Sequence, residues 1–172
     1  TSIELGAKIA RATKAAMGPL YPNEQIDEIL FWMEREGRLG RKAGAGFFNY
    51  NEKGKREGFW KGLQEKYPLS KTIPEFKDVQ HRLMFIQAIE AVRALEEGVL
   101  MDIREGDVGA ILGWGFAPWS GGPLSWLDIL GTPYAAERCQ ALCDTYGPRF
   151  ECPPLLADMC KNNEAFYERF ST

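Results

Sequence analysis

The hydrophobic and polar positions along the chain predict helices over most of its length. Residues 2–17 carry isoleucines and alanines at helical spacing. Gly18 followed by Pro19 predicts the end of this helix, because glycine favours the C-terminal cap and proline cannot continue it. A second helix is expected after Asn23, a suitable N-cap, and it closes at Gly37. Its apolar residues recur at i, i+3, i+4 and i+7 and share one stripe. They are Ile26, Ile29, Leu30 and Met33.

The stretch 38–61 has a different character, because glycines alternate there with basic residues. Phe47-Phe48-Asn49-Tyr50 is a short aromatic run, and residues 51–54 have the composition of a turn. We therefore expect a loop that contains a small hairpin. Residues 68–75 are then expected to link two halves of the chain.

The second half opens with a long predicted helix over 76–97, ended by Gly98. This helix is apolar on most sides, which is typical of the buried centre of a bundle. Asp102 with Glu105 predicts the capped start of a short helix that ends at Gly113. The apolar positions of the long helix are Val79, Leu83, Ile86, Ile89, Val92 and Leu95.

Residues 113–123, called the aromatic loop below, are dense in glycine, proline and aromatic side chains. Pro123 is expected to begin a helix that runs to Leu130, because proline suits the first helical position. Thr132-Pro133 begins a further predicted helix, which ends at Gly147, and Pro153-Pro154 begins the last one.

Two segments of the chain, 12–22 and 141–150, resemble each other. Each contains the end of a helix, then Gly-Pro, then an aromatic residue, with a further proline and a helix after it. The glycines, Gly18 and Gly147, are 129 residues apart. A single pair of short matches is compatible both with chance and with an internal duplication.

Composition narrows the class of protein. The chain has 172 residues, of which 45% are hydrophobic and 26% charged, as in an ordinary globular domain. A net charge of -3 gives no attraction to nucleic acid or to an anionic membrane surface. No window approaches the roughly 18 to 20 apolar residues of a membrane span. The chain begins at Thr1 with neither a methionine nor a signal peptide, so we expect a cut point inside a longer protein.

The four cysteines do not predict a metal site. Cys139 and Cys143 lie four apart on a helical face, where small buried hydrophobic residues are the simplest interpretation. Zinc needs paired ligands at short spacing, and the single histidine, His81, is far away in sequence. The remaining cysteines are Cys152 and Cys160. We expect reduced thiols and a cytosol-like compartment.

Two glycine-rich motifs carry a family resemblance. Residues 37–50, Gly-Arg-Leu-Gly-Arg-Lys-Ala-Gly-Ala-Gly-Phe-Phe-Asn-Tyr, resemble the motif that closes the C-terminal domain of 3-hydroxyacyl-CoA dehydrogenases. Residues 90–99 and the aromatic loop are similar to the second copy of that domain in the multifunctional fatty-acid β-oxidation enzymes. Those enzymes join an enoyl-CoA hydratase, a Rossmann NAD domain and two such helical domains. The resemblance covers nearly the whole chain.

The resemblance implies an all-α fold, a helical bundle of the 3-hydroxyacyl-CoA dehydrogenase C-terminal type (similar to the C-terminal domain of 6-phosphogluconate dehydrogenase), partly duplicated. On this interpretation residues 1–67 are the back half of a first copy with its loop and hairpin. Residues 68–75 are the linker, and residues 76–172 are the second copy. The implied role is to form part of the substrate cleft and the pseudo-dimer interface of an NAD-dependent L-3-hydroxyacyl-CoA dehydrogenase.

The resemblance also implies that the chemistry resides elsewhere. The family's catalytic histidine and glutamate lie in the Rossmann domain, and its substrate-contacting asparagine lies upstream of Thr1. We therefore expect no catalytic, cofactor-binding or metal-binding residue here, an inactive isolated chain, and NAD bound by the absent Rossmann domain. Gly113 and Gly115 have the first spacing of a dinucleotide fingerprint, but they follow a helix instead of a strand.

The implied partners are the upstream Rossmann and hydratase domains, an acyl-CoA substrate and a thiolase subunit. On this interpretation half of the first copy is missing, so the apolar faces of residues 2–33 need another surface to cover them. We therefore expect them to pack against the second copy or to cause self-association of the chain. The expected location is the bacterial cytoplasm, with the mitochondrion or the peroxisome as alternatives. A competing hypothesis is a helical interaction module without enzymatic activity that docks a partner such as a thiolase subunit. The helical domain of another Rossmann-type dehydrogenase is a third, but it does not explain the doubled glycine motifs.

Three groups of residues remain as candidates for a site. Arg38, Arg41 and Lys42 are a candidate contact for coenzyme A phosphates, with solvated loop charge as the more common alternative. His81 stands where the family's helical domains have an asparagine before Arg-Leu, so a structural role is favoured over acid–base chemistry. The third group is aromatic, and its side chains form either a ligand surface or the packing between the two copies. It consists of Trp114, Phe116, Trp119 and Trp126.

Overall fold

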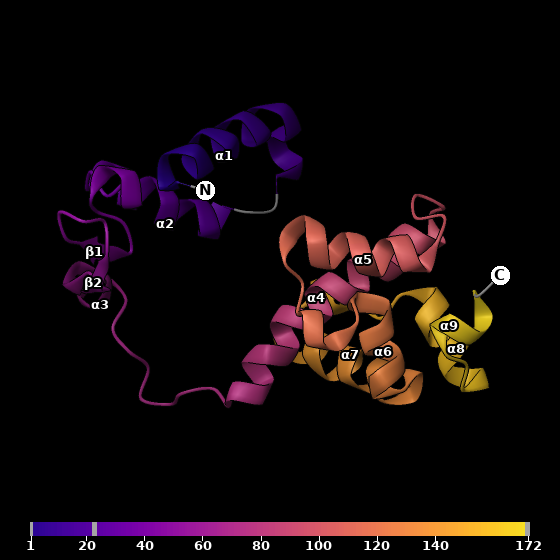
Figure 1. The fold of residues 1–172 in the computed structure, drawn as a ribbon. Coiled ribbons are helices and arrows are strands. Elements are labelled where there is room, and N and C mark those ends of the chain that lie inside the picture. The colour runs from indigo at the N-terminus through magenta and orange to yellow at the C-terminus, as the bar shows by residue number, and fades with distance from the viewer. Residues whose placement is uncertain (1, 22–23, 171–172) are drawn as a thin grey trace. The chain divides into compact units, whose positions relative to one another are not determined.

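The computed structural model describes residues 2–21 and 24–170 (Figure 1). The described residues are mostly helical and include one small two-stranded sheet, which confirms the expected all-α class. The chain divides into two compact units, Thr1–Thr72 and Ile73–Thr172. The boundary falls within the segment 68–75, where the linker was predicted.

The first unit begins with a pair of helices, α1 (Ile3–Met17) and α2 (Glu24–Arg35). Ser2 caps α1 by accepting a hydrogen bond from the Leu5 amide at 3.1 Å, and Gly18 ends it with a φ of 56°, as predicted. A short 3-10 helix, Gly18–Leu20, follows. The predicted cap Asn23 lies outside the described residues. The stripe of α2 is only partly buried, since Met33 is enclosed whereas Ile26 is exposed.

The hairpin predicted within 38–61 is present. Strand β1 (Phe48–Tyr50) pairs antiparallel with β2 (Arg56–Phe59), and Phe48 lies opposite Phe59. Helix α3 (Lys61–Lys66), which the pattern did not predict, follows directly. Trp60, between β2 and α3, stacks on Trp32 of α2 with ring centroids 5.2 Å apart. This stacking joins the hairpin to the small core of the first unit.

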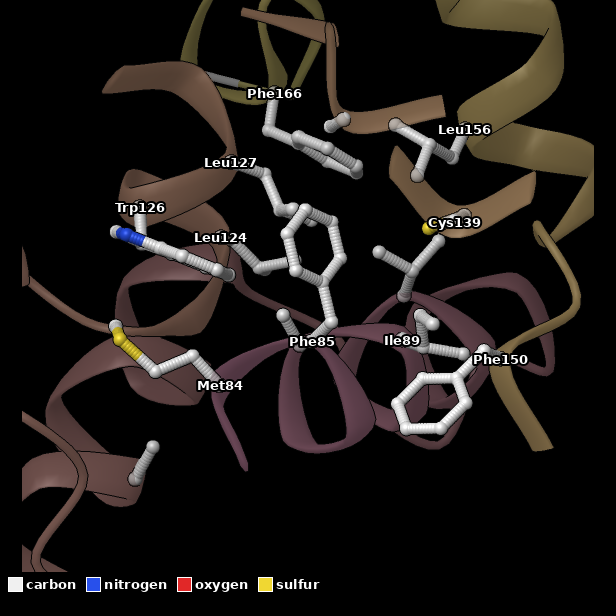
Figure 2. Packing of buried hydrophobic residues seen from close by; sticks show 14 of the residues in the cluster. Met84, Phe85, Ile89, Leu124, Trp126, Leu127, Cys139, Phe150, Leu156 and Phe166 are labelled. Carbon is white, nitrogen blue, oxygen red and sulfur yellow. The ribbon is translucent and has the colours of Figure 1, made fainter. Parts of the chain in front are cut away.

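The second unit holds the larger core. Its elements are α4 (Phe76–Glu96), α5 (Ile103–Trp114), α6 (Pro123–Leu130), α7 (Thr132–Tyr146), α8 (Pro154–Asn162) and α9 (Phe166–Arg169). Phe85 of α4 is fully buried and meets Trp126 of α6 edge to face at 4.9 Å. Figure 2 shows Phe85 pointing among Leu124, Leu127 and Phe166.

The prediction that α4 is the buried centre of a bundle was wrong in part. One face is enclosed, and α6 and α8 pack against it. Leu83, counted among the buried positions, is 62% exposed, and Val79 is also exposed. The apolar residues of α4 extend beyond the face that its neighbours cover. The enclosed residues are His81, Met84, Phe85, Ala88, Ile89 and Val92.

Two predicted boundaries in the second unit need smaller corrections. Helix α5 ends at Trp114 instead of Gly113, because Gly115 takes the left-handed conformation that closes it. The last helix is α9, a four-residue helix beyond α8 that the pattern did not predict. The predicted starts of α5 at its Asp102 cap, of α6 at Pro123 and of α7 at Thr132 are confirmed.

The two similar segments of the sequence take up the same local structure. Adding 129 to both bounds of α1 gives both bounds of α7, and each helix is followed by a short 3-10 helix and then another α-helix. Ile3 and Ala10 are buried on α1, and Thr132 and Cys139 are buried at the equivalent positions of α7. The match therefore extends to part of the buried face, since Ala7 is buried whereas its equivalent Ala136 is only partly buried. The interpretation of this similarity as half of one domain followed by a whole second copy stays a prediction.

Candidate functional site

Arg38 organises the glycine-rich loop of the first unit. Its guanidinium donates from Nε to the Gly46 carbonyl at 2.7 Å and from Nη2 to the side-chain oxygen of Asn49 at 2.7 Å. It also donates to the Phe48 carbonyl and lies 4.4 Å from the centroid of the Trp60 ring. Burial lowers the pKa of Arg38. These contacts direct the guanidinium into the protein and not toward a solvent-borne phosphate.

Arg41 and Lys42 are placed differently from Arg38. Both lie on a short 3-10 helix, Arg41–Ala43, and both are exposed. Gly44 closes this turn in the left-handed conformation, and a Cβ on Gly54 would lie 3.5 Å from Nε of Arg41. Arg41 therefore lies beside the tip of the hairpin. Of the three candidate phosphate contacts, Arg41 and Lys42 are thus exposed to solvent, and Arg38 is partly buried.

His81 belongs to a polar cluster that the sequence analysis did not recognise. His81 is only 5% exposed, and its Nδ1 accepts a hydrogen bond from Nε of Arg138 at 3.2 Å. Arg138 also contacts Asp78 at 2.5 Å, and the Tyr146 hydroxyl donates to the other oxygen of Asp78 at 2.7 Å. Burial, followed by the charges of Arg138 and Lys77, lowers the pKa of His81. This geometry fits the structural role favoured for His81.

Asp78 is held as a carboxylate by the same cluster. The hydrogen bond from Tyr146 and then the contact with Arg138 lower the pKa of Asp78. The i, i+3 spacing of Asp78 and His81 on α4 was the available signal in the sequence. Their partners Arg138 and Tyr146 lie on α7, about 60 residues away in sequence, so no local pattern could have identified them.

Asp107 forms a second buried cluster, at the start of α6. It accepts hydrogen bonds from the amides of Leu124 at 2.8 Å and Ser125 at 3.0 Å, and from the Tyr167 hydroxyl at 2.9 Å. A carboxylate at a helix N-terminus satisfies amides that lack partners within the helix. This aspartate of α5 therefore caps α6 from another helix and links it to α9. Its role is structural.

The aromatic residues of the third candidate group divide into two pairs. Phe116 and Trp126 are buried in the core of the second unit itself, whereas the packing interpretation placed them between the two copies. Trp114 and Trp119 are exposed, and Trp114 donates a hydrogen bond from its indole nitrogen to Gln87 at 3.0 Å. Packing within the unit thus explains two of the four aromatic residues and leaves two on the surface.

The described residues contain no group of three potential ligands placed to hold a metal ion. The four cysteines are free thiols, with Cys139 enclosed in the core. None of the helices in the described ranges combines the length and the apolar character needed to cross a bilayer.

Comparison with known proteins identifies the relatives of the chain. No protein-family model matches it. A fatty acid oxidation complex subunit alpha from Vibrio vulnificus is 36% identical over 159 residues, which is 90% of this chain. The chain is homologous to part of this alpha subunit. Subunits of the same name from Vibrio cholerae and Vibrio parahaemolyticus are each 35% identical over 90% of the chain.

This relationship confirms the resemblance to the multifunctional β-oxidation enzymes. The chain spans only about a fifth of the length of these relatives, 21% of the Vibrio vulnificus subunit and 22% of the other two. The homologous region of the alpha subunits thus corresponds to a mostly helical segment made of the two units described above.

Proposed function

We propose that the chain forms part of the substrate cleft and the pseudo-dimer interface of an NAD-dependent L-3-hydroxyacyl-CoA dehydrogenase in fatty-acid β-oxidation. The observation that carries this proposal is its similarity to fatty acid oxidation complex alpha subunits over 90% of its length. The assignment to the dehydrogenase part rests on residues 37–50 and on the aromatic loop, which resemble the C-terminal domains of that family. The location would be the bacterial cytoplasm, as expected for relatives from Vibrio.

The described residues do not fit a dinucleotide site. Such a site needs a strand that leads through a glycine turn into a helix within a parallel sheet. The described strands, β1 and β2, form an antiparallel hairpin, and Gly113 and Gly115 lie at the end of a helix. NAD would therefore be bound by another domain of a longer protein, and this chain would contribute binding surface and no chemical step.

The proposed interface is supported by the internal repeat and by exposed apolar residues. Helices α1 and α7 are offset by 129 residues at both bounds, which suits two copies of one helical unit. Leu5 and Ile9 on α1 and Leu112 on α5 are exposed apolar residues on these helical units. Apolar patches of this kind commonly mark contact surfaces.

A chimeric enzyme tests the proposal. In the alpha subunit of Vibrio vulnificus, the homologous segment would be replaced by this chain, and dehydrogenase and hydratase activities would be measured separately. We expect both activities in the chimera, and loss of only the dehydrogenase when the segment is deleted. The isolated chain should not reduce acetoacetyl-CoA with NADH. Dehydrogenase activity that survives deletion of the segment would contradict a role in the cleft.

Docking of a thiolase subunit is the second candidate. The relatives are named as subunits of a complex, so they assemble with another subunit. Met101, Val108 and Leu112 are exposed apolar residues in and beside α5 and offer a contact surface. Surface plasmon resonance with an immobilised thiolase subunit would detect this docking, and Leu112→Glu should abolish it. Equal binding of the variant would argue against α5 as the contact.

A further inference from the structure

A groove of about 410 Å³ lies in the second unit, beside α4 and the segment that joins α7 to α8. Its apolar lining includes Leu83, Ile86 and Phe150, and two arginines, Arg82 and Arg149, also line it. The volume falls within the range of pockets that hold small ligands. The groove combines an apolar surface with positive charge.

The positive charge of the groove is only partly offset by a neighbouring acid, because the charge of Asp78 interacts with that of Arg82 without forming a salt bridge. Among the described residues no salt bridge joins Arg82 or Arg149 to a carboxylate. The Arg82 guanidinium lies 4.0 Å from the centroid of the Tyr146 ring, which holds it in a defined position. Asp78, the acid that accepts from Tyr146, is already paired with Arg138. An anion that enters the groove therefore meets two guanidinium groups that form no salt bridge among the described residues.

The apolar lining is available as well. Leu83 is 62% exposed and Val79 is also exposed, although both stand on the longest helix of the unit. A ligand that covers them removes apolar surface from water, which is favourable without any specific polar contact. A free inorganic anion would leave this apolar surface exposed to water, and a neutral amphiphile would leave the two arginines without an anionic partner.

We propose that this groove binds a small amphipathic anion, with a carboxylate or phosphate head at Arg82 and Arg149 and an apolar tail against Leu83, Ile86 and Phe150. Guanidinium groups bind both kinds of head through paired hydrogen bonds. The site lies within one unit and does not depend on the dehydrogenase function proposed above.

The first test is a titration of the full 172-residue chain followed by ¹H–¹⁵N NMR. The probes are octanoate, octyl phosphate, 1-octanol and inorganic phosphate, the amphiphiles being kept below their aggregation limits. Octanoate and octyl phosphate should cause saturable shifts of the amides around residues 82–86 and 149–150, with the tighter one identifying the preferred head. Octanol and phosphate should bind much more weakly. Absence of saturable shifts with both anions, or equal binding of octanol, would overturn the proposal.

Variants assign the binding to the groove. Arg82→Gln and Arg149→Gln should each weaken octanoate binding about tenfold, the effect of losing one charge-assisted contact. Leu83→Glu, at a position exposed enough to accept a charge, should weaken it further by repulsion. Lys161→Gln removes the same charge from an exposed site on α8 and should leave the affinity unchanged. Wild-type affinity in both arginine variants would show that the anion binds elsewhere and would overturn the assignment.

Discussion

Arg138 donates a hydrogen bond from Nε to Nδ1 of His81 across 3.2 Å, which joins α7 to α4. A guanidinium can only donate, so His81 must be neutral and carry its proton on Nε2. The ring packs against Phe85 and Trp126, with centroids 5.6 Å and 6.1 Å away. Protonation would place a second positive charge beside Arg138 within the core.

This relationship predicts how stability depends on pH. Burial and Arg138 lower the pKa of His81 below its ordinary 6.5, so below that pH the unfolded chain binds a proton that the folded chain does not. The contribution of His81 to the free energy of unfolding should therefore be complete above pH 6.5. It should be lost as the pH falls from 6.5 toward the lower pKa of His81 in the folded protein. Urea denaturation at about pH 7.5 and pH 5.5 would measure this loss, which His81→Asn should reduce.

His81 is the only histidine of the chain, which permits a direct control. Its ring proton signals can be titrated by NMR without overlap from another imidazole. Asp78, Lys77 and Arg138 are the charged groups that act on it, and only Asp78 raises its pKa. A ring that titrates at or above 6.5 in the folded protein would refute the neutral, guanidinium-bound state.

Gly122 should not tolerate a side chain. A Cβ at this position would lie 2.4 Å from the Asp107 side chain, and the backbone has a φ of 120° that only glycine adopts readily. Gly122→Ala should lower the free energy of unfolding by about 2–4 kcal/mol, through backbone strain and disruption of a buried carboxylate. Gly109→Ala is the matched control, since it lies within α5 in open space and should be neutral or stabilising. Equal urea midpoints for the two variants would contradict this.

Arg38 should contribute more to the free energy of unfolding than a basic residue in a glycine-rich loop usually does. Its guanidinium bonds two carbonyls and the Asn49 side chain, so Arg38→Ala should destabilise the first unit by about 2 kcal/mol. Arg41→Ala should have little effect, because Arg41 is exposed. Hydrogen exchange of the hairpin amides would show the difference. Unchanged protection around residues 46–49 in Arg38→Ala would disprove the organising role.

Arg41 and Lys42 are the residues with which to test the predicted coenzyme A contact. If they meet its phosphates, the double variant Arg41→Ala with Lys42→Ala should weaken the binding of coenzyme A, and the loss should shrink as salt is added. Isothermal titration calorimetry on the chain would measure both effects. Lys8→Ala, an exposed lysine on α1, is the control. An unchanged affinity in the double variant would leave these residues as solvated loop charge.

The exposed apolar residues of α1 predict self-association of the chain. Leu5 and Ile9 lie four residues apart on one face and are both about half exposed. Leu5→Glu with Ile9→Glu should shift the protein toward monomer in size-exclusion chromatography with light scattering, whereas Lys8→Glu on the same helix should not. A wild-type chain that stays monomeric at high concentration would rule out association through α1.

The sequence by itself determined most of the helical framework. Caps and breakers such as Asp102, Pro123 and Gly18 act through the backbone of their own neighbours, so their effects are visible in a short window of sequence. The glycine-rich motifs likewise indicated a relationship to the multifunctional β-oxidation enzymes, which the similarity to the alpha subunits confirms. Short elements such as α3 and α9 escaped prediction because their few residues provide no periodic pattern.

Only the tertiary structure decided which faces are covered and which polar groups meet. Leu83 has the apolar character of a core residue, yet it is exposed because no described helix of the second unit packs on that side of α4. Asp107 finds its donors on α6 and α9, and His81 finds Arg138 on α7, far along the chain in each case. Local sequence fixes the helices because helical contacts span three or four residues. Burial, pKa shifts and the groove beside α4 depend on how those helices pack.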